Sequence, residues 1–292
     1  MKLNLRWGYN NVWIKEEDQF KVAFVVDGKL LEPTIMFFGL QNSPVTFQSM
    51  MNMLFNDLIK EGWVIIYMDD ILIFSKDLEE HHILVKKVLQ WLEDEDLFLK
   101  PKKCFFEKLS IEYLGMIISQ DKIQMDPTKL SVVLDWPTLK CVKDVQSFLG
   151  FGNFYQQFIH GFAHIMAPLM SLTQKDTTWH WDDDQQKAFD TLKQQFTSAP
   201  ILLMPNFSTP FQLEMDTSDY DYGTILSQQS DDRHWLPVTY MSKQMLLAER
   251  NYVIYDKELL AIIEALKLWQ HYLEGSLHPI EIWSNHKNLE YF

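Results

Sequence analysis

The chain is poor in cysteine, in glycine and in long apolar runs. Its 292 residues contain only two cysteines, which excludes a disulfide framework and every CxxC zinc or redox motif and fits a reducing compartment. Ten glycines, scattered prolines and no low-complexity tract indicate a folded chain throughout. No apolar run is long enough to span a bilayer, and residues 1–20 show no leader pattern. We therefore expect an intracellular protein without membrane association.

Basic residues are also scarce. Lys and Arg total 26 against 40 Asp and Glu, a net charge of −14, and this balance taken alone argues against nucleic acid. The nearest basic cluster, which we interpret as a solvated loop, is Lys100, Lys102, Lys103 and Lys108. A protein of this composition that handles nucleic acid must hold metal ions on its carboxylates, or its basic parts must lie outside this chain.

Periodicity divides the chain into an α+β beginning, a helical middle and a strand-rich end. Residues 1–120 contain β-type runs at 21–26, 63–74 and 111–119. They also contain a predicted helix, which begins at a capping box formed by Asp77 and Glu80 and runs to about residue 95. Helices are predicted at 127–136, 142–158 and 184–197. A strand begins at 211, and a helix over 256–273 carries one apolar stripe, so we expect it to pack on a sheet.

Two acids lie between apolar β-type runs. Asp69 and Asp70 follow Met68 at the tip of a predicted hairpin. Adjacent carboxylates between apolar strands repel each other and lose hydration, so their pKa values rise unless a cation compensates. Mg²⁺ is a suitable cation because it binds through one or two carboxylates plus substrate phosphates. A solvent-exposed acidic turn is the alternative interpretation.

Two further acids stand out near the end of the chain. Glu258 lies on or beside the buried stripe of its helix, where stability alone would not place a carboxylate. Its position in the first turn, where an acid favours the helix dipole, is the competing explanation. Asp216 ends an apolar strand and is followed closely by Asp219 and Asp221, which an acidic turn would explain equally well.

Eight segments form a succession of motifs along essentially the whole chain. The first are KLNLRWGYNN at 2–11, FGLQNSPVTFQ at 38–48 and YMDD at 67–70. The later ones are EYLG at 112–115, VQSFLGF at 145–151, DTSDY at 216–220, AERNY at 248–252 and DKELLAI at 256–262. In order and spacing these motifs resemble those of a Ty3/gypsy-type retrotransposon reverse transcriptase with its tethered ribonuclease H.

The resemblance implies a right-hand polymerase followed by an RNase H-like unit. It assigns residues 1–120 to a palm, 121–200 to a helical thumb and connection, and 201–292 to an RNase H-like α/β domain. Because Met1 falls directly before the first motif and Phe292 falls inside the RNase H unit, the fingers are expected to be missing and the last domain to be truncated at its C-terminus. The missing fingers would also help to explain the acidic balance.

The resemblance also implies ligands and partners. Asp69 and Asp70 in the palm, and Asp216 and Glu258 in the RNase H unit, would be catalytic ligands of paired Mg²⁺ ions, with Mn²⁺ as an alternative. Partners would be an RNA template, a DNA primer, an RNA–DNA hybrid and a dNTP. Tyr9 would select deoxynucleotides, although core packing would also explain it. The other residues expected to lie under the nucleotide and template are Gly39, Asn42, Pro44, Phe47 and Gln48.

Two amides depart from the family pattern. Asn4 and Asn285 stand where the family has aspartate, so each site has lost one metal ligand. Asparagine keeps the shape of aspartate and one carbonyl oxygen but carries no charge, and we expect a loss of about 10²–10³-fold or more in rate. We expect polymerase activity to be absent or nearly so.

Two classes of function follow. The first is reverse transcription, namely RNA-directed DNA synthesis and cleavage of RNA in hybrids, by a decayed or partial copy of an element. The second is a non-catalytic protein, either a structural subunit that pairs with a second copy or with a complete reverse transcriptase, or a domesticated nucleic-acid-binding remnant. Primer extension separates the two.

Overall fold

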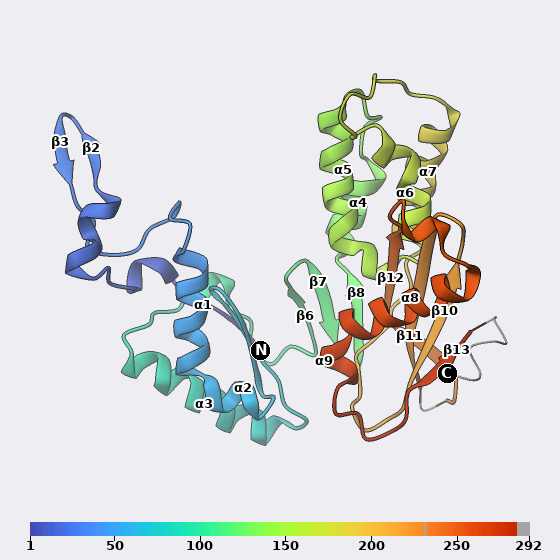
Figure 1. Ribbon diagram of the computed structural model, residues 1–292. Helices are drawn as coiled ribbons and strands as arrows, with labels where there is room; N and C mark the ends of the chain where they lie inside the picture. Colours follow the sequence, from blue (N-terminus) through green and yellow to red (C-terminus); the bar gives the residue numbers. More distant parts are fainter. Residues whose placement is uncertain (231, 285–292) are drawn as a thin grey trace. The chain divides into compact units, whose positions relative to one another are not determined.

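The structure is a computed structural model that describes residues 1–230 and 232–284. Its helices and strands form two compact units, Met1–Tyr113 and Leu114–Phe292, which are described separately below (Figure 1). The mixture of helices and sheets confirms the α+β prediction. Over the described residues, no helix has both the length and the apolar character needed to cross a bilayer.

A three-stranded sheet organises the first unit. Its strand order is β1 (Lys2–Asn4), β5 (Asp70–Ile73), β4 (Val64–Tyr67), and both pairs are antiparallel. The predicted hairpin is therefore confirmed as β4 and β5. Three helices supply apolar side chains to the same core as the sheet: α1 (Ser43–Leu54), α2 (Asn56–Lys60) and α3 (Leu78–Asp94). The buried residues of this core include Leu3, Phe47, Met51, Ile71, Ile73, Leu84 and Val88.

Helix α3 begins and ends close to the predicted positions. The side chain of Asp77 accepts a hydrogen bond from the backbone N–H of Glu80 at 2.8 Å, which caps the helix. The Glu80 carboxylate accepts from the N–H of Lys76 at 3.4 Å, one residue before the position that a capping box would use. The helix presents its apolar residues to the core, as the periodicity predicted.

The segment between β1 and α1 differs from prediction. Residues 21–26 were predicted as one strand, but Lys21 belongs to the 3₁₀ helix η2 (Glu16–Val22) and only Phe24–Val26 form strand β2, which pairs with β3 (Lys29–Leu31). Three acids in the first turn and a Lys21–Asp18 ion pair favour the helical turn. The short helices η1 (Gly8–Asn11) and η3 (Pro101–Lys103) and strand β6 (Ser110–Tyr113) complete the unit.

Four helices of the second unit confirm the helical middle of the chain. They are α4 (Pro127–Leu134), α5 (Val142–Tyr155), α6 (Phe162–Ser171) and α7 (Asp183–Thr197). Helix α5 was predicted to reach residue 158, but its last residues form the 3₁₀ turn η4 (Gln156–Phe158). Helix α6 was not predicted, and it contains Pro168, a residue that normally signals a break. These helices bury one aromatic-rich core.

A four-stranded sheet with a helix packed on it forms the rest of the second unit. The strand order is β12 (Trp235–Gln244), β11 (Asp221–Gln229), β10 (Phe211–Thr217), β13 (Glu281–Trp283), and only the β10–β13 pair is parallel. Helix α8 (Ile254–Leu268) packs on β10 and β11, as predicted. The predicted helix over 256–273 is interrupted at Trp269, after which α9 (Gln270–Leu273) follows, and η5 (Glu249–Asn251) precedes α8.

Short strands surround the helical segment in sequence. The predicted strand over 111–119 is two strands, β6 and β7 (Met116–Ser119), because Leu114 and Gly115 both adopt positive φ. Strand β7 pairs with β8 (Lys122–Met125), which pairs with β9 (Leu202–Leu203). Helices α4–α7 and the four-stranded sheet share one compact unit, and the division into palm, thumb and RNase H-like domain remains a prediction.

Candidate active site

The strand register of the first unit brings together the residues of two sequence motifs. Met68 and Asp69 form the turn of the β4–β5 hairpin, with Met68 at φ 52°, and Tyr67 pairs with Asp70 across it. On the other side of β5, Asn4 is the direct partner of Asp70. In addition, the N–H of Leu5 donates to the carbonyl oxygen of Asp69 at 2.8 Å. Asn4, Asp69 and Asp70 therefore lie together, although they are far apart in sequence.

Both oxygens of the Asp70 carboxylate have partners within the unit. The Asn4 amide donates from Nδ2 to Asp70 Oδ1 at 2.7 Å. The ammonium of Lys2 lies 3.5 Å from Asp70 Oδ2. The Tyr113 hydroxyl donates to the main-chain oxygen of Asp70 at 3.5 Å, and burial, followed by the charge of Asp70, raises the pKa of that tyrosine. Asp70 is thus held by its side chain and its main chain.

Asp69 has a different environment. Burial and, to a smaller degree, the neighbouring charge of Asp70 raise the pKa of its carboxyl group, while Lys103 opposes this shift. Gly8 lies directly against the carboxylate, since a Cβ atom at Gly8 would be 1.9 Å from Asp69 Oδ1 and 2.9 Å from Phe47 Cζ. The carboxylate therefore depends on a residue without a side chain at position 8.

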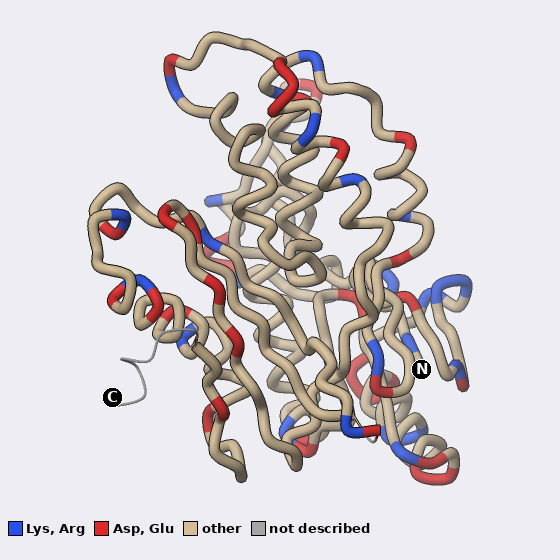
Figure 2. Tube along the Cα trace, turned by 90° about the vertical axis from the view of Figure 1, so that its right-hand side faces the viewer, with Lys and Arg blue, Asp and Glu red and all other residues tan. Residues whose placement is uncertain are grey.

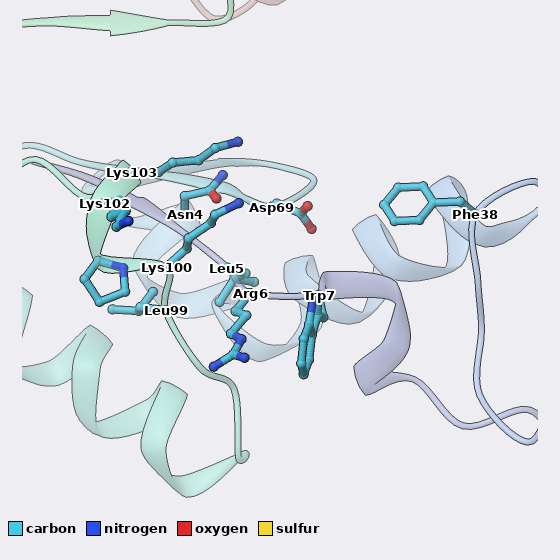
Figure 3. A pocket seen from close by; sticks show the side chains of 11 residues that line it. Asn4, Leu5, Arg6, Trp7, Phe38, Asp69, Leu99, Lys100, Lys102 and Lys103 are labelled. Carbon is cyan, nitrogen blue, oxygen red and sulfur yellow. The ribbon is translucent and has the colours of Figure 1, made fainter.

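A pocket of about 470 Å³ opens beside Asp69. Figure 3 shows Lys100 and Lys103 extending past Asn4 toward Asp69, with Phe38 on the far side of the acid. Arg6 and Trp7 also line the pocket, and the guanidinium of Arg6 lies 4.1 Å from the Trp7 ring centroid. The complete lining is Asn4, Leu5, Arg6, Trp7, Phe38, Asp69, Leu99, Lys100, Pro101, Lys102 and Lys103.

The pocket changes the interpretation of the basic cluster. Lys100, Lys102 and Lys103 are exposed, as a solvated loop requires, but all three also form one wall of the pocket that holds Asp69. Basic residues elsewhere are distributed over many elements (Figure 2). A cationic wall beside a carboxylate is suited to a ligand that carries phosphate and needs a second charged group for orientation.

Three of the predicted substrate-binding residues reach the hairpin or its neighbours. The Tyr9 ring packs against Phe38 and Phe47 with centroids 5.0 and 5.5 Å apart, and its hydroxyl lies 3.9 Å from Met68 Sδ. Phe47 is fully buried. The Gln48 side chain donates to the carbonyl of Ile66 at 3.0 Å and accepts from the N–H of Met68 at 2.8 Å. The ring contacts support the core-packing interpretation of Tyr9, and its contact with a substrate remains a prediction.

The other three lie before and within the first turn of α1. Gly39 has φ 106° and open space where a side chain would be. Asn42 is exposed at the N-cap position without a side-chain cap, and Pro44 occupies the first turn of the helix. Their contact with a substrate remains a prediction.

The acids of the second unit lie on β10 and α8. Asp216 is exposed near the end of β10, opposite Gly223 of β11. Glu258 is only 7% exposed and accepts a hydrogen bond from the Ser284 hydroxyl at 2.6 Å. Ser284 follows β13, whose last residue pairs with Glu214 of β10, so Glu258 is linked to the strand that runs beside β10.

The metal-binding roles of these acids remain predictions. Asn285 lies outside the described residues, so its relation to Asp216 and Glu258 also remains a prediction. Within residues 1–230 and 232–284, no three His, Cys, Asp or Glu side chains gather in an arrangement that could hold a metal ion.

Sequence reasoning missed four residues around the first site: Lys2, Arg6, Trp7 and Gly8. Lys2 could have been found, because alternation along β1 places it on the same side as Asn4, two residues later. Gly8 could not, because its importance depends on how closely η1 approaches the hairpin turn. Arg6 and Trp7 lie in the same motif but carried no signal of a pocket.

Family models match both units. Residues 1–118 match the model described as reverse transcriptase (RNA-dependent DNA polymerase). Residues 181–282 match the RNase H-like domain found in reverse transcriptase. The first match includes every residue that lines the pocket beside Asp69, and the second includes Asp216 and Glu258.

Similar proteins extend these matches over nearly the whole chain. The Transposon Tf2-3 and Tf2-4 polyproteins of Schizosaccharomyces pombe are 37% identical over 288 residues, which is 99% of this chain and 22% of theirs. The chain thus spans about a fifth of the length of these curated relatives. The fold resembles foamy viral protease-reverse transcriptase. One such structure, in complex with double-stranded DNA, has a TM-score of 0.84 at 21% identity and covers 100% of this chain and 51% of its own. A second, with an RNA/DNA hybrid, has a TM-score of 0.84 at 22% identity, covering 99% of this chain and 39% of its own.

Proposed function

Because this chain belongs to the Ty3/gypsy-type retrotransposon reverse transcriptases and carries their RNase H-like domain, we propose that it serves reverse transcription with impaired polymerase chemistry. Its first unit would take an RNA template, a DNA primer and a dNTP. Its second unit would act on the RNA strand of an RNA–DNA hybrid. The Tf2 polyproteins are several times longer, so the proposal covers only the activities that these two regions would carry.

The pocket beside Asp69 supports a nucleotide as ligand. Lys100, Lys102 and Lys103 offer cationic groups to phosphates, and Phe38 offers an aromatic surface on the opposite side. Tyr9, fixed between Phe38 and Phe47, would limit the room beside the sugar and so favour deoxynucleotides. These residues bind and orient the nucleotide, and they do not depend on the residue at position 4.

Mg²⁺ is the proposed cofactor, with Mn²⁺ as an alternative. Hard cations of this kind prefer carboxylate oxygens. The family pattern offers Asp69 and Asp70 in the first unit, and Asp216 and Glu258 in the second. A bound ion would stabilise the charge that develops on phosphate oxygens. The buried Glu258, held by Ser284, would keep its carboxylate in one orientation for that purpose.

The observation that carries impaired catalysis is the hydrogen bond from Asn4 Nδ2 to Asp70 Oδ1 at 2.7 Å. An amide nitrogen that donates to a carboxylate offers a cation neither charge nor a lone pair. Asn4, at the position of the expected third ligand, therefore donates to an oxygen of Asp70, one of the two remaining carboxylates. We expect the rate of polymerisation to be lower by about 10²–10³-fold or more than that of a homologous enzyme with aspartate at this position.

Primer extension by the purified chain tests this proposal. A labelled DNA primer on an RNA template is incubated with dNTPs and either Mg²⁺ or Mn²⁺, next to an active relative and to Asp69→Asn. We expect residual incorporation that Asp69→Asn abolishes. Incorporation at the rate of the active relative would contradict impaired catalysis, and incorporation that survives Asp69→Asn would assign it to a contaminant.

The same observation favours a second candidate, a non-catalytic protein that still binds nucleic acid. Such a protein would act as a structural subunit that pairs with a second copy of itself or with a complete reverse transcriptase. Alternatively, it would be a domesticated remnant that binds nucleic acid. This candidate predicts that the chain binds an RNA–DNA hybrid but incorporates no nucleotide with either Mg²⁺ or Mn²⁺. Size-exclusion chromatography of the chain mixed with an active relative would detect the pairing, and unchanged elution of both proteins would exclude it.

A further inference from the structure

The two acids of the YMDD turn differ in how many partners they have. Asp70 uses Oδ1 to accept from Asn4 at 2.7 Å, and its Oδ2 forms an ion pair with Lys2 at 3.5 Å. Asp69 lies at the edge of the pocket, with its side chain against Gly8. The turn thus contains one carboxylate that is held and one that faces open space.

Lys2 is built into this cluster. Its side chain is 9% exposed, and a lysine buried to this degree is normally paired. Its three N–H groups have three acceptors within 3.5 Å: Asp70 Oδ2, Glu112 Oε2 at 3.3 Å and the Glu112 carbonyl oxygen at 3.2 Å. The ammonium also lies 5.8 Å from the centroid of the Tyr113 ring.

The cluster joins three elements of the first unit. Lys2 and Asn4 belong to β1, Asp70 begins β5, and Glu112 and Tyr113 end β6. The Tyr113 hydroxyl adds a second link, because it donates to the main-chain oxygen of Asp70. Lys2 and Asp70 therefore both link β6 to the sheet that carries the acidic turn.

These contacts do not fit a pair of divalent cations shared by both acids. A cation at Asp70 would have to displace the Asn4 amide, which would lose its acceptor, or share the carboxylate with the buried ammonium of Lys2, which would repel it. We propose that Asp70 is a structural anchor in this chain, with Lys2 as its resident cation, and that Asp69 alone is open to a divalent ion. This inference rests on the proposed function, since it assigns different tasks to two residues of the same site.

Mn²⁺ titration of the whole chain, followed by electron paramagnetic resonance, tests the assignment without any measurement of activity. The variants are Asp69→Asn and Asp70→Asn, with Asp57→Asn as a matched change at an exposed aspartate of the same unit. All variants share the second unit, so any ion it binds cancels in the comparison. We expect Asp69→Asn to remove one ion or weaken its binding at least about tenfold, and Asp70→Asn to change it less than about threefold.

Two outcomes would overturn the proposal. One is a loss of Mn²⁺ binding in Asp70→Asn that equals the loss in Asp69→Asn. The other is Asp69→Asn binding that matches the wild type. Asp70→Asn should also lower the melting temperature, because Lys2 loses a partner, whereas Asp57→Asn should not.

Lys2→Met gives an independent test in case Asp70→Asn does not fold. The methionine keeps the length of the side chain but frees Asp70 Oδ2, so Mn²⁺ should bind more tightly by about threefold or more. Lys2→Arg should restore wild-type binding, since the guanidinium can pair with the same acceptors. Unchanged or weaker binding in Lys2→Met would contradict the anchor role. Failure of primer extension leaves these outcomes unaffected, so the inference and the proposed function can fail separately.

Discussion

At the scale of single residues, the acidic turn is a place where function and stability oppose each other. Asp69 and Asp70 are adjacent, but Asp70 accepts a hydrogen bond from Asn4 and pairs with the ammonium of Lys2, whereas the cation that acts on Asp69 is the more distant Lys103. Burial and the charge of Asp70 raise the pKa of Asp69. An ionised Asp69 is therefore less favourable in the folded chain than in the unfolded one.

We predict that Asp69→Asn stabilises the metal-free chain at neutral pH, by no more than about 1 kcal/mol because the carboxyl group is half-exposed and screened. A raised pKa means that the folded state binds the proton more tightly. In the wild type, the stabilising contribution of the protonated Asp69 carboxyl group is therefore complete below the unfolded pKa of about 3.9. It is lost as the pH rises through the pKa of the folded state.

Urea unfolding in EDTA, from about pH 4 to about pH 8, checks this sign. The stability difference between Asp69→Asn and the wild type should grow as the pH rises. The control is Asp57→Asn, which removes the same charge from an exposed aspartate of the same unit, outside the pocket. If the wild type instead becomes more stable than Asp69→Asn as the pH rises, its surroundings favour the ionised Asp69 carboxylate, and the prediction is wrong.

At the scale of elements, the site depends on how closely η1 approaches the β4–β5 turn. Gly8 begins η1 and touches the Asp69 carboxylate and the Phe47 ring. Tyr9, the next residue, packs between Phe38 and Phe47. A side chain at position 8 would therefore displace the acid, the aromatic ring or the short helix itself.

We predict that Gly8→Ala destabilises the first unit by about 1–3 kcal/mol, as overpacking of a filled site does. Gly150→Ala is the matched control, since Gly150 lies inside α5 with open space around the new methyl group and should gain about 0.5–1 kcal/mol from helix propensity. Thermal unfolding of both variants measures the effect. Equal shifts of the same sign would show that Gly8 is not in close contact.

Elements with a strong local signal could be predicted from the sequence. The hairpin β4–β5 was found because two continuous apolar runs flank the Asp69-Asp70 pair. Helix α3 was found because helical spacing and an Asp77 cap agree. Helix α6 was missed because Pro168 argues against a helix locally, while its burial against other helices stabilises it. The division between β6 and β7 depends on positive φ at Leu114, a residue that rarely adopts it.

The site followed the same rule. The meeting of Asn4, Asp69 and Asp70 could be predicted, because the motifs that contain them carry the family resemblance. The engagement of both Asp70 oxygens and the contact between Gly8 and Asp69 could not, because both depend on distances set by tertiary packing. The lysines at 100–103 were assigned to a solvated loop, since nothing local shows that η3 faces the acidic turn.

At the scale of the whole molecule, the net charge of −14 opposes binding to nucleic acid, and local charge has to overcome it. The lysines of the pocket wall are a local exception beside an acidic turn. Electrostatic attraction to phosphates acts over about one Debye length, roughly 10 Å at 0.1 M salt. The position of these lysines therefore matters more for binding than the total charge of the chain.

We predict that replacing Lys100, Lys102 and Lys103 together with alanine weakens binding of an RNA–DNA hybrid and flattens its salt dependence, by about one unit of slope for each phosphate that a lysine no longer neutralises. Fluorescence anisotropy between about 50 and about 200 mM salt measures both effects. The control replaces Lys29, Lys60 and Lys86, three exposed lysines of the same unit that do not line the pocket, and removes the same total charge. If the two triple variants lose affinity and slope equally, the chain responds to net charge and the pocket wall has no special part in binding. If only the pocket variant does, the lysines beside Asp69 are the groups that bind the phosphates.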